Sequence, residues 1–525
     1  MQRKTSAAMC LAGALFACGT TQAADIDQAG ADKLKASLTH YLPKDLLDTG
    51  FLSVKPATGR YEIVTDIMKL LAGKLPPETT VTGLKPFTVF ATPAEKDLWK
   101  VEGDGNFDVT AGYKIADAPA TMRYIISNYS YTGLFDPAIA YMRNGTFTAS
   151  GLKLSTTGGT EQIDARFGDM NYVVSSTDAA GGALDFTGSG TLSDFYEKVV
   201  SPNTPPVEIS ADSIAFDATV KGAMLREIRD LVFFVLDNMK HKDLTDAQQQ
   251  ELKAKALAAL PFASSIDENI RLNNLNVATA QARFGVKSFD YGLNLSGAGD
   301  AMRFGVSMKA ADPILPAGLV PPVYASLVPQ QTEVSFSMAD MKIGEFLRKF
   351  LEKADFNKKE PISDAEGAEL VKLIFPDGKV AMTFDRIAAR APTYDVEMTG
   401  KLTSALENTK QVSMTATVIA RNFDATIAAI QEAAKADPQL NQVSFGLMMA
   451  KGFAKDDGGG KQRWEVEVRE DGSVDINGQQ VKGPDTVDEE PEALGTEEPD
   501  ALGTPEDSDE PGTDAQPGTE QQQPE

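Results

Sequence analysis

The chain has 525 residues, a net charge of −25 and only two cysteines. This length allows a large core or several domains. Lys and Arg are spread among acidic residues, which argues against a nucleic-acid partner, because phosphate binding needs a concentrated basic surface.

Residues 1–23 have the order of a secretory signal peptide. Arg3 and Lys4 precede an apolar stretch, and Thr21-Gln22-Ala23 supplies a small-residue cleavage site. We therefore expect an exported protein of a Gram-negative-type periplasm. Cleavage after Ala23 would remove both cysteines, Cys10 and Cys18. An alternative is a lipoprotein anchored through an acylated Cys18, because Leu15-Phe16-Ala17-Cys18 loosely resembles a lipoprotein box.

The first elements after the leader are predicted to be helical. Residues 25–40 carry a thin apolar stripe that includes Leu34 and Leu38, and residues 61–73 place Ile63, Ile67 and Leu70 on one helical face. No segment after the leader approaches the length of a membrane span, so we do not expect an integral membrane protein.

Between residues 99 and 174 the apolar period changes to two. Short alternating stretches such as 107–113 and 163–167 are separated by turn signals such as Asn144-Gly145. This pattern predicts antiparallel strands with one buried face. The proline-rich segment 201–206 predicts a boundary between two related halves, residues 24–200 and 207–482.

The second half repeats a strand followed by an amphipathic helix. The pairs are 214–220 with 223–240, 334–338 with 343–354, and 412–416 with 422–436. A further helix is predicted from Thr245, where Gln248 completes a capping box. Five prolines in 312–330 predict an ordered apolar loop over the core, and Asp471-Gly472 predicts a closing hairpin. The expected fold is α+β and β-dominated, with long curved antiparallel sheet and packed amphipathic helices.

Apolar side chains in the strands of the second half are predicted to share one face. They are Phe284, Phe289, Tyr291, Phe304, Met308, Phe336 and Met338. One interpretation is an ordinary filled core. The other is a partly open groove for acyl chains, since Met and Phe are bulky, apolar and adaptable.

The sequence predicts no catalytic, cofactor-binding or metal-binding residues. The two histidines, His40 and His241, carry no motif, and no known nucleophile or nucleotide motif occurs. Asp104-Gly-Asn106-Phe-Asp108 begins like a calcium loop but has Val109 at the glycine position and Ile115 at the position of the final Glu. A hydrolase that uses a carboxylate pair stays open as a less favoured alternative.

The segment 483–525 contains 15 Asp or Glu, seven Pro and no Lys or Arg, so it supplies most of the net charge. Such a composition cannot bury enough apolar surface to offset the entropy of ordering. We expect a disordered acidic tail, which either solubilises the protein or binds a basic partner.

The closing stretch Arg463-Trp-Glu-Val-Glu-Val-Arg-Glu-Asp-Gly-Ser-Val-Asp-Ile-Asn477-Gly478 resembles the end of YdgA-like periplasmic proteins, which are distantly similar to AsmA-like envelope proteins. The resemblance covers residues 440–480 and the general strand–helix pattern. It implies a long curved sheet and an envelope or lipid-related role, and it carries no catalytic residues. The cleavable-looking leader and the acidic tail depart from the family pattern.

Together these features predict a non-enzymatic envelope protein that binds lipid or an envelope partner in an apolar groove. The alternative is a structural or scaffolding protein of the periplasm without a small ligand. The ligand, the partner and the oligomeric state stay open.

Overall fold

The computed structural model describes residues 26–39, 42, 44–115, 118–159, 161–238, 241–299, 301–406, 408 and 411–485. The chain divides into a unit that ends at Gly483 and a second unit, Pro484–Glu525, of which only the first two residues are described. The predicted leader, Cys10, Cys18, His40 and nearly all of the predicted tail lie outside the described residues.

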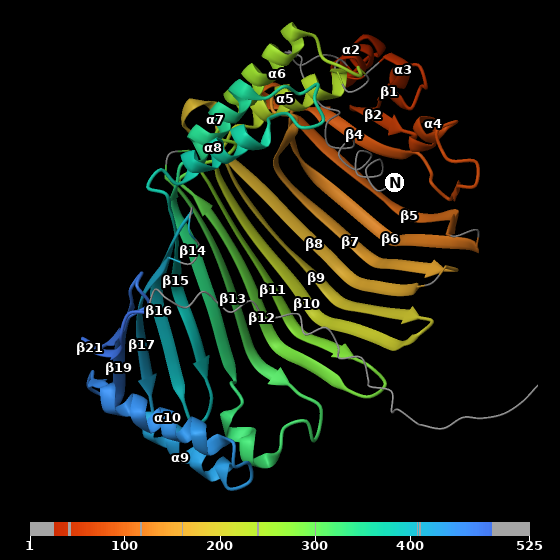
Figure 1. The fold of residues 1–525 in the computed structure, drawn as a ribbon. Helices are drawn as coiled ribbons and strands as arrows, with labels where there is room; N and C mark the ends of the chain where they lie inside the picture. Colours follow the sequence, from red (N-terminus) through yellow and green to blue (C-terminus); the bar gives the residue numbers. More distant parts are fainter. Residues whose placement is uncertain are drawn as a thin grey trace, which may run out of the picture. The chain divides into compact units, whose positions relative to one another are not determined.

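The first unit contains one long, curved antiparallel sheet (Figure 1). Its described strands are β1 (Leu52–Ala57), β2 (Arg60–Thr65), β3 (Thr80–Thr82), β4 (Phe87–Pro93), β5 (Trp99–Ile115), β6 (Ala118–Asp136), β7 (Tyr141–Thr157), β8 (Gln162–Asp178), β9 (Leu184–Ser201), β10 (Thr204–Ala223), β11 (Ser265–Ala278), β12 (Arg283–Ser296), β13 (Met302–Ile314), β14 (Gln331–Met341), β15 (Lys379–Arg390), β16 (Asp395–Ala405), β17 (Val412–Arg421), β18 (Lys455–Asp456), β19 (Lys461–Val468), β20 (Val474–Ile476) and β21 (Gln479–Lys482). The predicted β-dominated α+β class with a long curved antiparallel sheet is confirmed.

The strands follow one another through the sheet in chain order. From β5 to β16 each strand pairs with the strand before it and the strand after it. At the two ends of this series, β4 also pairs with β2, β5 with β3, and β17 with β19. Segment 201–206, where the sequence predicts a boundary between halves, contains the turn from β9 to β10. Ser201 and Thr204 are paired across this turn, so the sheet continues through it.

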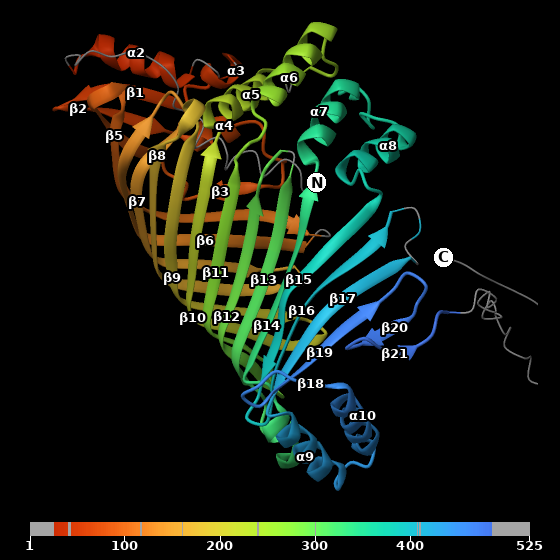
Figure 2. The same ribbon diagram turned by 90° about the vertical axis from the view of Figure 1, so that its left-hand side faces the viewer.

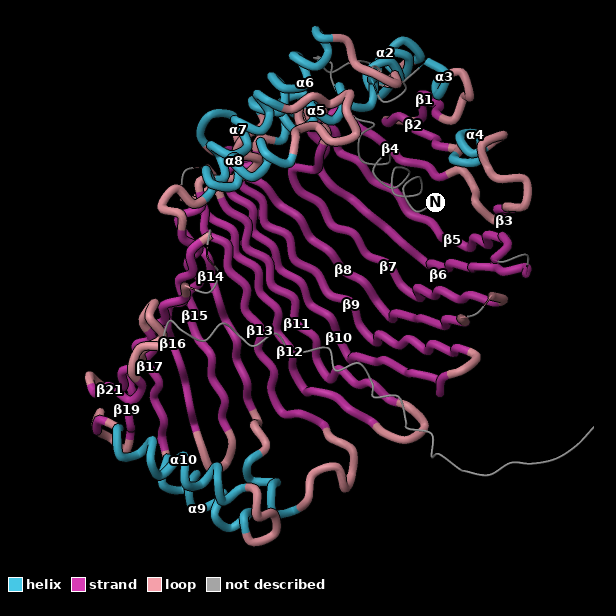
Figure 3. Tube along the Cα trace, viewed as in Figure 1, coloured by secondary structure: helices cyan, strands magenta, loops and turns pink. Residues whose placement is uncertain are grey.

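The described helices lie beyond the strand ends or at the first strands (Figures 1 and 2). Helix pairs are inserted into three hairpins, between β10 and β11, between β14 and β15, and between β17 and β19. The described helices are α2 (Gln28–Thr39), α3 (Lys44–Leu47), α4 (Ile67–Leu71), α5 (Leu225–Asn238), α6 (Asp246–Ala258), α7 (Ile343–Lys353), α8 (Asp364–Ile374), α9 (Phe423–Ala434) and α10 (Leu440–Phe453). Figure 3 shows these helices in cyan beside the strands in magenta.

Local sequence explains where the inserted helices begin. The predicted capping box of α6 is present, with Thr245 and Gln248 bonded reciprocally. A second capping box joins Ser363 and Glu366 at the start of α8, a helix that the sequence reading did not identify. The second helix of the last pair, α10, was also not predicted.

The predicted helix over 61–73 is wrong. Residues 60–65 form β2, in which Tyr61, Ile63 and Thr65 are buried and alternate with half-buried residues. Only Ile67–Leu71 is helical, capped by the Asp66 side chain, which accepts a hydrogen bond from the backbone N–H of Met68. Apolar residues four positions apart, such as Ile63 and Ile67, fit the period of a helix and also that of a strand. Residues 60–65 form a strand because β2 pairs with β1 and with β4.

The apolar segment 312–330 also differs in position from the prediction. It contains the end of β13 and a short 3-10 helix, η3 (Pro322–Leu327). The Tyr324 hydroxyl donates to Asp437 beside α9, and Tyr394 donates to the Leu327 carbonyl. The loop is therefore ordered as expected, but it lies at the strand ends next to α9.

The best-buried core lies where α2 packs on the first strands. Ala31, Leu34 and Leu38 of α2 contact a cluster that includes Phe51 and Tyr61. A second, smaller cluster contains Leu184, Phe186 and Ala223. Over most other strands the side chains are half-buried or exposed.

Across eight neighbouring strands, β6 to β13, the apolar alternation shifts by one residue at one aligned position. We call this line the crease. The register of regular pairs is interrupted there between each pair of strands. Its positions are Ser127, Gly151, Gly168, Asp194, Asp212, Asn274, Lys287 and Asp312.

The crease uses left-handed backbone on alternate strands. Gly151, Asp194, Asn274 and Asp312 have φ values of 63°, 52°, 51° and 53°. Gly, Asn and Asp tolerate this conformation best. Because Ile126 and Tyr129 on either side of the crease line the same cavity, the shift keeps apolar side chains on one face.

We predict that Asp194→Gly leaves stability nearly unchanged, whereas Asp194→Val lowers the free energy of unfolding by about 1–2 kcal/mol, because a β-branched residue resists positive φ. Urea denaturation followed by circular dichroism measures both. Thr191→Val, at a regular position of the same strand, is the matched control. Equal midpoints for the Gly and Val variants would contradict a strained position at Asp194.

Candidate functional site

The two faces of the sheet differ sharply in chemistry. One directly paired row runs along a single face from β5 to β19. We call it the central row, and it consists of Gly103, Tyr131, Phe147, Tyr172, Gly190, Phe216, Ile270, Tyr291, Met308, Val334, Ile387, Met398, Val418 and Trp464. All of its residues are apolar, aromatic or glycine, so this side is the apolar face.

In the N-terminal part of the apolar face, tyrosine rings lie over glycines. A Cβ added at Gly103 would lie 2.5 Å from the Tyr131 hydroxyl oxygen, and one at Gly105 would lie 2.8 Å from that of Tyr129. On the far side, a Cβ at Gly188 would lie 2.7 Å from the Tyr172 hydroxyl oxygen. Because glycine has no side chain, the tyrosine rings can lie flat along the sheet. The apolar surface is therefore closer to the backbone at these strands than elsewhere.

A cavity of about 550 Å³ lies on this glycine-rich part of the apolar face. It falls in the size range of small-molecule sites, roughly 300–1,000 Å³. Its lining comes from β4 to β8 and the turn before β7, and includes Phe107, Ile126, Tyr129, Phe147 and Tyr172. Such a lining suits an apolar molecule better than a charged one.

The aromatic rings of the cavity support one another. Tyr129 and Tyr131 are stacked with ring centroids 6.5 Å apart, and Tyr172 stacks on Phe216 at 5.7 Å. Burial raises the pKa of the Tyr131 hydroxyl well above its ordinary value, and burial followed by the charge of Asp104 raises the pKa of Tyr129. These hydroxyls therefore stay protonated and able to donate at neutral pH.

The apolar residues predicted from the sequence lie farther along the same sheet, in β12 to β14. Tyr291 is paired with Met308, and Phe304 with Met338. Phe289 and Phe336 belong to the same face by register, while Phe284 lies across the crease and is 44% exposed. The large apolar cavity is in β4 to β8 instead. The alternating glycines at 103, 105, 188 and 190 were the available sequence signal for it.

The opposite face is polar and carries a ladder of ion pairs across β11 to β17. The sequence of charges is Arg271, Asp290, Lys309, Glu333, Arg386, Glu397 and Arg421. Arg386 joins Glu333 at 3.4 Å to Glu397 at 3.1 Å, and Arg421 reaches Glu397 at 3.0 Å. Because the signs alternate from strand to strand, this face largely neutralises itself.

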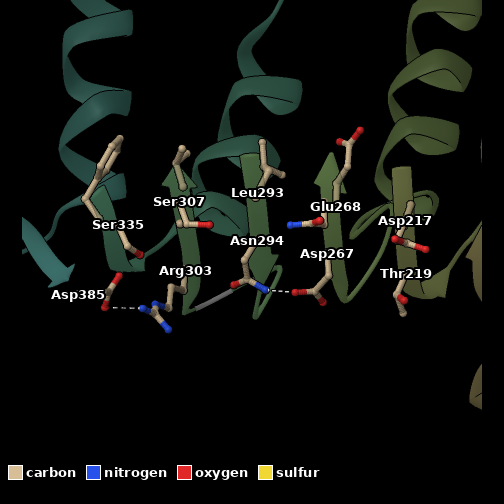
Figure 4. A pocket seen from close by; sticks show the side chains of 16 residues that line it. Asp217, Thr219, Asp267, Glu268, Leu293, Asn294, Arg303, Ser307, Ser335 and Asp385 are labelled. Atoms are coloured by element: carbon tan, nitrogen blue, oxygen red, sulfur yellow. Dashed lines mark hydrogen bonds and ion pairs between the residues drawn. The ribbon is translucent and has the colours of Figure 1, made fainter. Parts of the chain in front are cut away.

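A second cavity, of about 400 Å³, lies on the polar face (Figure 4). Asn294 donates to Asp267, and Arg303 donates to Asp385 at 2.8 Å and to Ser337 at 2.9 Å. Of the four carboxylates that line this cavity, Asp267 and Asp385 are thus engaged by donors, whereas no such donor is seen at Asp217 and Glu268 in the described chain. Every displaced carboxyl pKa in the described chain is lowered, at Glu102 and Asp108 by hydrogen bonds from Lys100 and Arg123 and at Glu366 by hydrogen bonds from Ser363. A glycosidase general acid needs a raised value.

The remaining sequence candidates lie apart from both cavities. His241 is exposed in the connection between α5 and α6. The calcium-loop candidate lies within the extended strand β5, where Arg123 binds both carboxylate oxygens of Asp108 at 2.8 and 2.7 Å. In the described ranges there is no group of three or more potential metal ligands. None of the described helices is long and apolar enough to cross a membrane.

Comparison with protein-family models, with curated proteins and with solved structures found no match. The resemblance to YdgA-like and AsmA-like proteins therefore stays a prediction.

We expect Arg386→Met to lower the free energy of unfolding by about 0.5–1 kcal/mol, because it breaks the ladder between Glu333 and Glu397. The difference from the unsubstituted protein should shrink in high salt, which screens exposed charges. Denaturant titrations at two salt concentrations measure it. Lys401→Met in β16 removes a charge that makes no ion pair with the described residues, so an equal, salt-dependent loss there would contradict a role for the ladder.

We expect Arg123→Gln to raise the pKa of Asp108 towards its ordinary value, because hydrogen bonds from Arg123 lower it in the folded protein. A folded-state pKa below the unfolded one stabilises the protein above the unfolded pKa, and this stabilisation is lost as the pH falls through the folded pKa. Carboxyl NMR titration of aspartate-labelled protein measures the shift. An unchanged Asp108 titration in the variant would show that Arg123 is not its cause.

Proposed function

We propose that this protein is an exported, non-enzymatic protein of the bacterial envelope that binds lipid acyl chains on the apolar face of its sheet. The observation that carries the proposal is the cavity of about 550 Å³ lined by aromatic and aliphatic side chains. An open cavity of this size with an apolar lining is typical of a ligand-binding site, whereas the side chains of an ordinary core would fill the space.

Export to the periplasm is supported by the sequence of residues 1–23. The central row supports an elongated ligand, because it extends the apolar surface from the cavity through β12 to β14. Met308 and Val334 of this row are each 37% exposed. Acyl chains could therefore lie across several strands while the polar face stays in water.

A scaffolding function is the second candidate. It is favoured by α10, whose Phe445, Met448 and Met449 are 60%, 46% and 52% exposed. Capture of a periplasmic protein that is lost on Phe445→Asp, by a protein that carries no lipid, would support this function instead.

The lipid proposal predicts that the full chain, purified gently from its own compartment, carries lipid in native mass spectra and after organic extraction. Phe147→Asp should reduce the lipid content at least about tenfold, because it places a carboxylate among Tyr131 and Tyr172, its paired neighbours.

Val173→Asp is the matched control, since Val173 lies one residue from Tyr172 and points to the polar face, where it is 41% exposed. This variant should keep its lipid. A bare polypeptide mass for the unsubstituted protein, or equal lipid loss in both variants, would count against the proposal.

A further inference from the structure

The floor of the apolar cavity carries polar groups that the protein itself does not use. Tyr129, Tyr131 and Tyr172 line the cavity, and within the described part of the chain their hydroxyls make no hydrogen bond. The Tyr129 and Tyr131 rings lie over Gly105 and Gly103 of β5, within the strands that line the cavity, whereas the Tyr172 hydroxyl lies over Gly188 of β9, beyond those strands. None of these hydroxyl oxygens is among the fully buried side-chain atoms without a partner in the described chain, so water can reach them. A ligand that displaces this water leaves the hydroxyls unpaired unless it accepts their hydrogen bonds.

Charge is missing from the same floor. None of the residues that line the cavity is Asp, Glu, Lys, Arg or His. Arg143 follows the lining residue Met142, but it is held by Asp136 at 2.7 Å and by Asp178 at 2.5 Å. A phosphate or carboxylate drawn into the cavity would therefore lose its hydration without gaining a cation.

We propose that the cavity takes an uncharged lipid that carries a carbonyl oxygen, bound through hydrogen bonds from Tyr129 and Tyr131. This inference rests on the proposed lipid-binding function and adds the chemical class of the lipid. Diacylglycerol esters and isoprenoid quinones share this chemistry. Sites that hydrogen-bond a ligand group discriminate strongly against analogues that lack it.

The test offers the purified full chain an equimolar mixture of dioleoylglycerol, its dioleyl ether analogue, a short-chain ubiquinone, dioleoylphosphatidylglycerol and oleate, and reads the bound species by native mass spectrometry. We expect the ester or the quinone to be retained at least about tenfold over the ether and over both anionic lipids. Whether the ester or the quinone dominates distinguishes the two sources of the carbonyl.

The double variant Tyr129→Phe/Tyr131→Phe removes only these two hydroxyls. It should fold like the unsubstituted protein, as checked by circular dichroism and melting temperature, because these hydroxyls have no described protein partner. It should still bind lipid but lose the preference for ester over ether. Tyr196→Phe is the control, because the Tyr196 ring packs under Arg166 outside the cavity.

Two results would overturn the inference while leaving the proposed function in place. One is equal or preferred retention of phosphatidylglycerol or oleate by the unsubstituted protein. The other is an unchanged ester preference in the double variant. Retention of no lipid at all would overturn both the inference and the proposed function.

Discussion

Hydrogen bonding between strands that are neighbours in the chain holds the sheet together, because the described helices α5 to α8 lie beyond the strand ends (Figure 2). Helices α9 and α10 contact the apolar face at Trp464 of β19. Each face must therefore tolerate partial exposure. On the polar face, alternating charges such as Arg386 and Glu397 offset one another. On the apolar face no such pairing is possible, and the half-buried central row is the chemical consequence.

The cavity follows from how glycine and tyrosine are combined on that face. Glycine weakens a strand because it adds no side chain to pack, but Tyr131 over Gly103 and Tyr172 over Gly188 restore ring contacts across the gap. The same rings cannot fill the space above them. The same combination that stabilises pairing between strands thus also leaves the apolar face open, and at β5 it places the Tyr131 hydroxyl close to the backbone of the sheet.

Much of the fold could be predicted from the alternation of residues, and most of the site could not. The strands from Trp99 to Val174 and the capping box at Thr245 were readable because their signals are local. The helix predicted over 61–73 failed because a short apolar pattern fits two periods. The crease could not be predicted, because a single Asp194 or Asn274 gives no signal in the sequence. These residues form a pattern only when the strand register aligns them. The cavity needs Phe107, Phe147 and Tyr172 together, which only pairing across strands provides.

The chain-order arrangement of the strands also bears on how such a protein can change in size. From β6 to β16 each strand pairs only with its predecessor and its successor, as in repeat proteins whose units contact their nearest neighbours alone. A hairpin gained or lost as a unit would return the chain to the same edge with the same face polarity. The apolar surface could thereby lengthen or shorten in steps of two strand spacings, roughly 10 Å, without any rearrangement of the strands on either side.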